Sequence, residues 1–474
     1  MSVTDGSDRL GSGRLDGDVV AIETLTSACA TPGHTAADRT DLFWSGVRSS
    51  GSGQVAFTWT SRKSLAALKR AGVVRHSSLD RWSQAEALEK VRADPSRLRA
   101  LGALHCWRTM TSEQVAAVIG SRLTSSSRSI DLPLLVAAGL AQRGAAFAAE
   151  RRAAVPMLWR PDIAARSMGF EDDLTYAEWL GVYAGQEWSW GAQASRHNLL
   201  TTELSLRVAE YTPIGTVFGE LLASAELLFP ARDGRKASKR TADAVWIRPD
   251  GMRIVVEATA NASSTFRRRV EDWIALLLAD RERSTVVLFV DVGDPLDHHA
   301  TLPSRIRRTL AEASTSTPER VRARIADRLA FVRYRDFFPG PGLVHTGFLG
   351  LRVERPTGAA GERFEQVDLL DPFAVPFTPA DRATALAPIT NSGSIWGVPW
   401  WLRPAPIDTG AVVCRLAGLD RTEMPPAKRS ELARRLDHRP DSEPGAQEGH
   451  GDDGTTPDTA STGPRRPRAL ALGA

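Results

Sequence analysis

Cysteine is scarce in this chain, and its spacing argues against a disulfide or zinc framework. The 474 residues contain three cysteines, Cys29, Cys106 and Cys414, which are far apart and form no CxxC pair. Small secreted domains and zinc knuckles need closely spaced cysteines, so neither class fits this sequence. Isolated thiols are the ordinary state in a reducing cytosol, and we expect a cytoplasmic protein.

Long apolar runs and a secretion signal are also lacking. The longest apolar runs, such as Ile274–Ala279, are far shorter than the roughly 20 residues that a membrane-spanning helix needs. The opening residues 1–18 lack the basic-then-apolar pattern of a signal peptide. We therefore expect no membrane partner.

An excess of charge of one sign is lacking as well. The chain has 60 Lys and Arg residues and 56 Asp and Glu residues, which gives a net charge of +4 and a pI of about 9.1. This balance excludes a polycationic chain but allows a local basic face. With 42% hydrophobic and 24% charged residues, the composition is that of a folded protein, and the length predicts two to four domains.

A β-hairpin is predicted in the middle of the chain. The strand-like runs Ala242–Arg248 and Met252–Thr259 flank the triplet Pro249–Gly251. This triplet suits a three-residue loop, in which Gly251 supplies the positive φ at the end of the turn.

The length of this loop sets the register of the hairpin. Counting back along both strands pairs Ala244 with Val256, and Asp243 with Glu257. The two carboxylates then share one face with Cβ atoms about 5 Å apart, whereas a two-residue loop would put them on opposite faces. Carboxylates this close repel each other unless a cation or a proton offsets their charge, and such oxygen-rich pairs suit Mg²⁺ or Mn²⁺.

The residues around the hairpin predict a mixed α/β domain. Ser264–Asp280 has apolar residues at helical spacing, and Thr285–Val290 is a continuous apolar run typical of a buried strand. A strand, a crossover helix and a second strand imply a right-handed parallel unit. Ahead of the hairpin, Leu199–Tyr211 is predicted to form a helix that carries Glu203. The order is therefore helix, strand, strand, helix, strand.

This order and these acids resemble the PD-(D/E)XK nuclease fold, a restriction-endonuclease-like mixed α/β sheet. The resemblance implies catalytic and metal-ligating roles for Asp243 and Glu257, with Mg²⁺ or Mn²⁺ as the cofactor if the site is active. It also implies a further acid from a preceding helix, either Glu203 or Glu220. Thr259 stands where the family has a Lys that polarises the attacking water, so endonuclease activity is left open. The cations that could replace this Lys are Lys236, Lys239 and Arg267.

A DNA-binding module is predicted ahead of this domain. Three helices with short turns, over about 95–106, 111–120 and 125–138, resemble a winged helix-turn-helix, whose third helix enters the major groove. Small hydroxyls and a cation at the entry to the third helix suit phosphate contacts, and Arg143 follows its end. The entry residues are Ser125, Ser127 and Arg128. A three-helix packing module that does not bind DNA is the alternative.

A basic tract lies directly before Asp243. Residues 231–240 hold five cations, which would lie at the mouth of the acidic site. The residues that we expect to contact DNA here are Arg235, Lys236, Lys239, Arg240 and, on the following helix, Arg267. Phosphate binding would make the affinity fall steeply with salt, whereas a solvated basic loop is the alternative.

The whole arrangement resembles the replication-relaxation family, which is associated with plasmids and integrative elements of high-GC Gram-positive bacteria, the actinobacteria. The resemblance covers about residues 95–292. The matching residues are the Leu-x-x-x-Gly-Leu-Ala-Gln-Arg pattern that ends at Arg143, together with His197, Glu203, Asp243 and Glu257. It implies double-stranded DNA and other replication or transfer proteins as partners.

These patterns divide the chain into six segments and leave three functions open. The segments are a disordered arm (1–40), a helical region that is alternatively a first, tandem winged helix (41–95), the winged helix with a Trp-rich connector (96–190), the nuclease-like α/β domain (191–370), an irregular cover (371–435) and a disordered tail (436–474). The first function is a DNA-binding accessory protein with a degenerate nuclease-like domain. The alternatives are an active Mg²⁺-dependent endonuclease and a winged-helix regulator or protein-interaction module.

Overall fold

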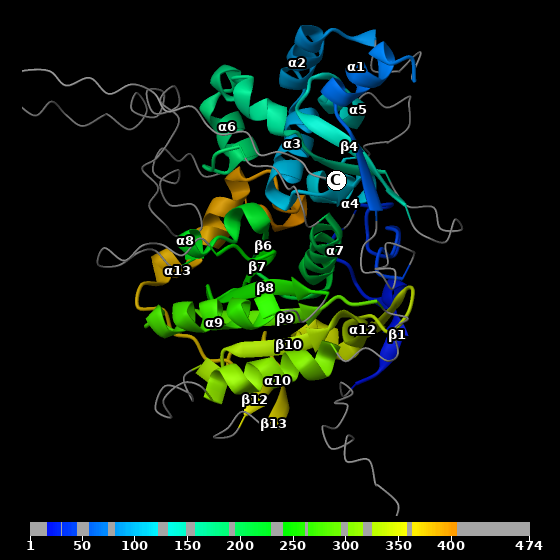
Figure 1. The fold of residues 1–474 in the computed structure, drawn as a ribbon. Coiled ribbons are helices and arrows are strands. Elements are labelled where there is room, and N and C mark those ends of the chain that lie inside the picture. Colours follow the sequence, from blue (N-terminus) through cyan, green and yellow to red (C-terminus); the bar gives the residue numbers. More distant parts are fainter. Residues whose placement is uncertain are drawn as a thin grey trace, which may run out of the picture.

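The structure is a computed structural model that describes residues 17–29, 31–44, 56–73, 81–121, 131–147, 157–188, 195–228, 240–260, 264–294, 302–315, 325–357 and 363–404. It is a mixed α/β protein, with a small sheet and several helices at the top of Figure 1 and a larger sheet below them. Helix α7 (Ser195–Tyr211) lies between these two parts and contacts both. Within the described residues, no helix is both long and apolar enough to cross a membrane.

The larger sheet contains the predicted hairpin. Its strands are, in spatial order, β13 (Arg363–Asp368), β12 (Arg352–Thr357), β10 (Leu329–Arg333), β9 (Thr285–Asp291), β8 (Arg253–Thr259), β7 (Ala244–Ile247) and β6 (Thr216–Gly219). The predicted register is confirmed, because Ala244 pairs with Val256. The predicted parallel unit is confirmed too, since β8 and β9 run parallel and α9 (Ser264–Ala279) connects them. The short strand β6, antiparallel to β7, is an addition that the sequence pattern does not predict.

Different helices cover the two faces of this sheet. Trp246 of β7 donates through Nε1 to the hydroxyl of Ser205 at 2.8 Å, so α7 packs on the face that carries Trp246. Side chains alternate along a strand, and Glu257 of β8 therefore points to the opposite face, where Trp273 of α9 contacts it. Helix α10 (Leu302–Thr315) packs beside α9.

The upper part contains the predicted three-helix module. Its elements follow in the order α3 (Pro95–Trp107), β3 (Met110–Thr111), α4 (Ser112–Ile119), α5 (Asp131–Ala137), β4 (Ala141–Phe147) and β5 (Leu158–Pro161). Strand β5 pairs with both β3 and β4. Helix α4 begins with the predicted capping box, in which the side chains of Thr111 and Gln114 each accept from the backbone N–H of the other.

Residues 41–95 do not form a separate winged helix over the part that the structure describes. Strand β2 (Ala56–Thr60) pairs with β4 and completes one four-stranded sheet in the order β2, β4, β5, β3. Helix α1 (Arg62–Arg70) follows, and α2 (Gln84–Arg92) packs against α3 and α5. Helices α1 and α2 agree with the predicted helical region, whereas β2, which contains Phe57 and Trp59, is a strand that the prediction lacks.

The predicted disordered arm is also wrong over residues 17–29 and 31–40. Strand β1 (Val19–Ala21) pairs with β11 (Leu343–His345), more than 300 positions away in the chain. The side chains of Ile22, Cys29 and Ala36 are buried. Gly, Ser and Asp dominate residues 1–18, but the apolar residues that follow find partners in distant parts of the sequence.

The segment after β13 joins the two halves of the molecule. Helix α13 (Arg382–Asn391) packs near the loop of the β7–β8 hairpin, where Gly251 approaches Ala385. Farther along, Trp107 of α3 donates to the carbonyl of Gly397 at 2.7 Å, and Trp401 donates to the carbonyl of Ala209 in α7 at 3.0 Å. The irregular cover thus includes a helix. Residues 405–435 and the predicted tail over 436–474 lie outside the described residues.

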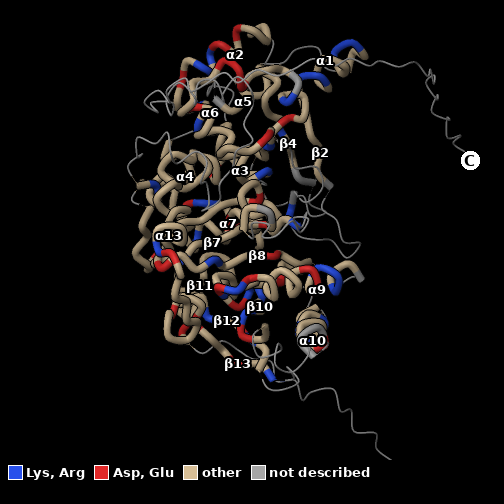
Figure 2. Tube along the Cα trace, turned by 90° about the vertical axis from the view of Figure 1, so that its left-hand side faces the viewer, with Lys and Arg blue, Asp and Glu red and all other residues tan. Residues whose placement is uncertain are grey.

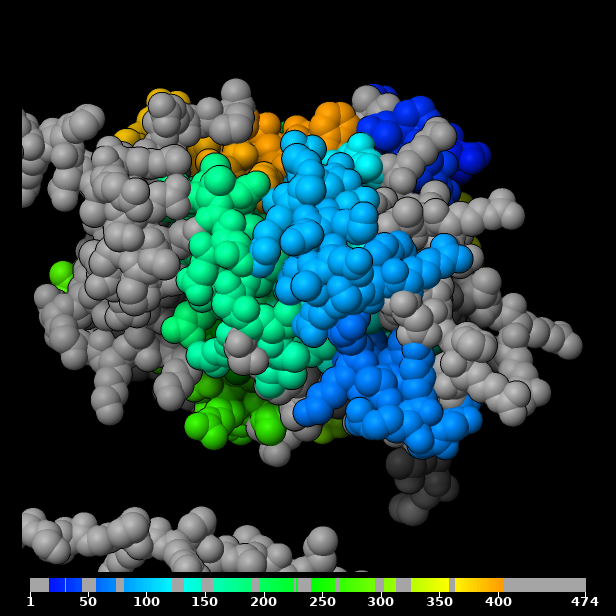
Figure 3. All heavy atoms as spheres, turned by 90° about the horizontal axis from the view of Figure 1, so that it is seen from above, coloured from blue at the N-terminus to red at the C-terminus, as the bar shows by residue number. Residues whose placement is uncertain are grey.

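The remaining short helices complete the connections. They are α6 (Tyr176–Tyr183), α8 (Ala225–Leu228) and α12 (Tyr334–Phe337). Seen from above, residues 157–188 (green) lie beside residues 81–107 (light blue), and residues of the final described segment (orange) border both (Figure 3).

Candidate functional site

The hairpin brings the two predicted acids together. Gly251 has φ of 91°, and its N–H donates to the carbonyl of Arg248, which closes the predicted loop. At the other end of β7, the Asp243 carboxylate accepts a hydrogen bond from the backbone N–H of Ala258 at 2.7 Å. The carboxylate of Glu257 is close enough to act on the charge of Asp243. The predicted proximity of Asp243 and Glu257 is therefore confirmed.

Three donors hold the Glu257 carboxylate, whose side chain is 3% exposed. Arg240 donates to Oε1 through Nη2 at 2.9 Å and through Nε at 3.2 Å. Arg269 of α9 reaches Oε2 through Nη1 at 3.4 Å. Trp273, one helical turn further along α9, donates to Oε1 through Nε1 at 2.7 Å. Both oxygens of this buried carboxylate therefore accept from protein groups, and two cations balance its charge.

Asp243 lies in an acidic environment. Its burial, the neighbouring Glu257 and then Glu220 raise the pKa of the Asp243 carboxyl well above its ordinary value, although the N–H of Ala258 and the charge of Arg269 oppose this. A carboxyl held among other acids takes up a proton more readily, because ionising it adds a like charge in a poorly solvated place.

The third acid beside this pair is Glu220. It follows β6 directly, and its Oε2 accepts from the Asn198 side chain at the start of α7 at 2.9 Å. Arg108 lies 3.9 Å from its other oxygen. The resemblance to the nuclease fold allowed Glu220 as an alternative to Glu203, but it assigned no role to Asn198. The short strand β6, which positions Glu220, was itself not predictable.

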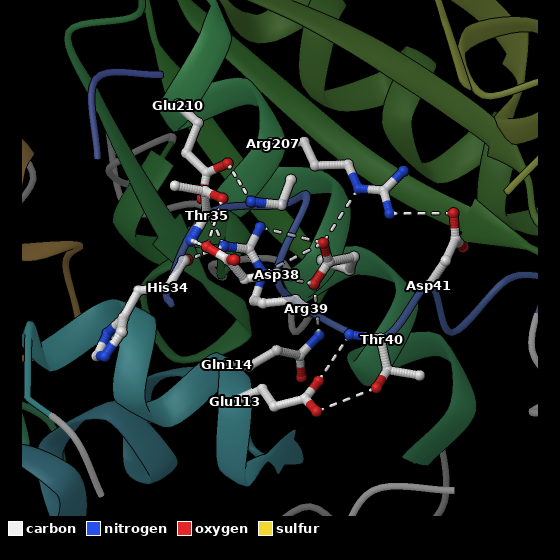
Figure 4. Close-up of polar contacts among 12 residues, drawn as sticks. His34, Thr35, Asp38, Arg39, Thr40, Asp41, Glu113, Gln114, Arg207 and Glu210 are labelled. Atoms are coloured by element: carbon white, nitrogen blue, oxygen red, sulfur yellow. Dashed lines mark hydrogen bonds and ion pairs between the residues drawn. The ribbon is translucent and has the colours of Figure 1, made fainter. Parts of the chain in front are cut away.

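Glu203 lies elsewhere, and its predicted place in the acidic site is wrong. It points from α7 into a buried ionic cluster, where Arg39 donates to it at 3.1 Å and Arg207 at 3.0 Å. Gln114 of α4 donates to its other oxygen at 3.3 Å. Figure 4 shows Arg39, Arg207 and Gln114 of this cluster. Glu203 is five positions after Asn198, and at 3.6 residues per turn this separation turns the side chain about 140° around the helix. Only one of the two residues can therefore face Glu220.

The two Arg residues set the protonation of Glu203. Burial alone would raise the pKa of this carboxyl, but the charges and hydrogen bonds of Arg39 and Arg207 outweigh burial and lower its pKa to about 2. Glu203 is thus an ionised, fully paired carboxylate.

Thr259 occupies the face of β8 that carries Glu257, as predicted for the position of the family's Lys. It is fully buried, and among the described residues no hydrogen-bond partner is found for its hydroxyl. A threonine cannot supply the positive charge that polarises a water. Arg267, one of the proposed replacements, forms surface pairs with Glu271 at 3.0 Å and Glu312 at 3.5 Å instead. The cation from α9 that does reach the acids is Arg269.

The Glu257 oxygens that Mg²⁺ or Mn²⁺ would need already accept hydrogen bonds from protein groups. In the described part of the chain, no group of three or more His, Cys, Asp or Glu side chains could hold a metal ion. A metal at Oε1 of Glu257 would compete with Arg240 and Trp273, and a metal at Oε2 would lie beside the positive charge of Arg269.

The predicted DNA contacts divide into described and undescribed residues. Ser125, Ser127, Arg128, Arg235, Lys236 and Lys239 lie outside the described residues. Arg143 lies on β4 with an exposed side chain, whereas Arg240 is occupied by Glu257.

The third helix of the module does not present its described side chains to solvent. Leu132, Leu134, Leu135 and Val136 are at most 1% exposed. Helices α2 and α3 pack on α5, and the side chains of α1 and α2 also donate to the carbonyls that end it. These four apolar side chains therefore face the interior of the module and cannot themselves contact a DNA groove.

Comparisons with known proteins add no further constraint. No protein-family model, no curated protein and no solved structure matches the chain.

Proposed function

We propose that this protein is a cytoplasmic DNA-binding accessory protein for the replication or transfer of a mobile element, with a nuclease-like domain that does not cleave DNA. Its partners are double-stranded DNA and other replication or transfer proteins. The order α7, β7, β8, α9, β9, with the acids on the hairpin, supports the nuclease-like part of the proposal. The order α3, β3, α4, α5, β4, β5, with β5 between β3 and β4, supports a winged-helix module.

The observation that carries the choice of an accessory role is the state of Glu257. A metal-dependent nuclease needs this carboxylate as a ligand, but here Arg240, Arg269 and Trp273 occupy it. Thr259 next to it cannot act as the cation that orients the attacking water. The acids and their two Arg partners form a closed, nearly neutral cluster, which stabilises the fold at the end of the hairpin.

The experiment is a combined cleavage and binding assay on supercoiled plasmid. The wild-type protein, Asp243→Ala and Glu257→Ala are incubated with plasmid in Mg²⁺ or Mn²⁺, and the same samples are analysed by gel shift. We expect salt-sensitive binding and no nicking in any sample. Nicking by the wild-type protein that both substitutions abolish would refute the accessory role, and the absence of binding would refute the DNA partner.

An active endonuclease is the second candidate, and one observation favours it. Asp243, Glu257 and Glu220 lie close enough to influence one another, and Arg269 brings a cation to the same place. In such an enzyme Glu220 rather than Glu203 would be the third acid. The same plasmid assay, with Glu220→Gln added, separates the two candidates.

A further inference from the structure

The chain that forms β2 and α1 offers a basic surface beside the three-helix module. Residues 56–73, which form β2 and α1, contain four cations and no acid. The cations are Arg62, Lys63, Lys69 and Arg70.

The cations of α1 form two rows along the helix. Lys63 and Arg70 are seven residues apart, which brings them to the same side about 10 Å from each other, and both are exposed. Arg62 and Lys69 repeat this spacing on the neighbouring side. Arg62 anchors the helix, because its guanidinium donates to the carbonyl of Ala137 at the end of α5. Helix α1 has no buried residue, and the side that carries Lys63 and Arg70 faces outward.

The strands beside α1 extend the basic area. Arg143 of β4 pairs with Thr60, the last residue of β2, and its side chain is exposed. The guanidinium of Arg160 lies 4.1 Å from the ring centroid of Trp59. The indole of Trp59 in turn covers Gly144, where a Cβ would come within 2.5 Å of the ring. Side chains alternate along a strand, so the stacked pair of Trp59 and Arg160 lies on the other face of the sheet from Arg143.

We name the area formed by five cations the β2–α1 surface; they are Arg62, Lys63, Lys69, Arg70 and Arg143. Figure 2 shows Lys and Arg at both ends of α1, and Figure 3 shows residues 56–73 (mid-blue) on the outer face of the upper part. An anionic membrane is a less suitable partner, because α1 has nine residues and its leucines, Leu65 and Leu68, offer little apolar area for insertion.

We propose that the β2–α1 surface contacts the phosphate backbone of double-stranded DNA. This inference rests on the proposed DNA-binding function and deepens it by naming the contact surface. Because the contacts are to phosphates, they position the protein on the duplex without reading its sequence.

The test replaces three exposed cations of this surface in the full chain. The variant is Lys63→Ala, Arg70→Ala and Arg143→Ala, which spares Arg62 and the stacked Arg160. A matched control removes three exposed cations from α10 and β13, at the opposite end of the molecule in Figure 1: Arg305→Ala, Arg308→Ala and Arg363→Ala. A third protein, Lys63→Arg, Arg70→Lys and Arg143→Lys, keeps every charge.

Binding to a short fluorescent duplex is measured from about 50 to 200 mM salt. Each phosphate contact contributes about 0.9 to the slope of log affinity against log salt, so the first variant should have a slope about 2.7 smaller than the wild type. It should also bind more weakly at every salt concentration. The control and the charge-keeping protein should match the wild type, and equal circular dichroism spectra should show that all four proteins are folded.

The outcomes separate the two proposals. Wild-type binding that the first variant retains unchanged would overturn the β2–α1 surface and leave the DNA-binding function standing. No binding by the wild type would refute the DNA-binding function itself, and the surface with it. Equal losses of DNA affinity in the first variant and the control would show that only net charge matters, and would overturn the assignment of the β2–α1 surface. A parallel experiment measures binding to vesicles of phosphatidylserine and phosphatidylcholine. If the wild type bound these vesicles but not DNA, and the first variant did not bind them, the partner of this surface would be a membrane and not DNA.

Discussion

Replacing Arg39 by Met should destabilise the protein more than the loss of an ordinary ion pair. Arg39 is the centre of a buried ionic cluster that fixes residues 31–44 on α7, and its side chain is 1% exposed (Figure 4). It donates to Glu203 at 3.1 Å and to Glu210 at 2.5 Å. Arg207 pairs with Glu203 and, at 3.2 Å, with Asp41. Two cations thus face three carboxylates, and without Arg39 one cation remains.

The size of the effect follows from this imbalance. Removing one partner of a buried ion pair typically costs about 3–5 kcal/mol, because the other charge is left in a poorly solvated place. We expect Arg39→Met to lower the free energy of unfolding by that amount at neutral pH. The matched control is Arg166→Met, whose exposed pair with Glu187 should contribute about 1 kcal/mol or less.

Urea unfolding followed by circular dichroism and by tryptophan fluorescence measures both variants, and limited proteolysis reports whether residues 31–44 detach first.

The pH dependence gives a second check on the same cluster. The pKa of Glu203 is lowered by its Arg partners, so the stability that it contributes is present above about 4.5 and is lost as the pH falls towards 2. Without Arg39 this contribution is smaller. The difference in the free energy of unfolding between the wild type and Arg39→Met should therefore decrease in acid. The reasoning would be refuted if Arg39→Met lowered the free energy of unfolding no more than Arg166→Met does, or if its difference from the wild type stayed constant as the pH falls.

Three further predictions concern single contacts. Gly251→Ala should lower the free energy of unfolding by about 1–3 kcal/mol, because φ is 91° and the new Cβ would meet a backbone oxygen of α13 at 2.6 Å. The control is Gly342→Ala, where φ is 66° and the space is open, and it should lower the free energy of unfolding by less in the same urea assay. Trp273→Phe should keep the packing but lose the hydrogen bond to Glu257. The free energy of unfolding, measured with heat or urea, should fall by about 1.5–3 kcal/mol. No change would mean that the Glu257 carboxylate does not depend on the indole. Burial lowers the pKa of His105 to about 3, so the folded state resists its protonation. The stability that neutral His105 contributes is present above about pH 6.5 and is lost as the pH falls. Between about pH 6 and 5, the free energy of unfolding of the wild type should therefore fall by about 1.4 kcal/mol per pH unit more than that of His105→Gln.

The hairpin was predictable because its information is local. Pro249–Gly251 fixes the loop, the loop fixes the register, and the register brings Asp243 and Glu257 together. The crossover helix and the parallel strand were predictable for the same reason, since apolar spacing reports which side of an element is buried. Each of these inferences needs only neighbouring residues.

The errors arise where a segment depends on distant partners. Strand β1 is held by β11, and α5 is covered by α1 and α2, so neither outcome is written in the local pattern. Trp273 was counted among the apolar residues of its helix, although its indole N–H serves Glu257. Composition likewise described residues 1–40 as polar and could not reveal that His34 and Arg39 are buried against α4 and α7.

The position of Glu203 bears directly on whether the acidic site could ever cleave DNA. A nuclease that used Glu203 would have to withdraw it from Arg39 and Arg207 and leave two buried cations without their shared carboxylate. That rearrangement would cost several kcal/mol, more than a weakly bound metal could return. Glu220 carries no such constraint, because its side chain is 32% exposed and its Arg108 contact is long, at 3.9 Å. Any catalytic version of this site must therefore be built on Glu220, Asp243 and Glu257, and the release of Glu257 from Arg240 and Arg269 is the step on which its activity would depend.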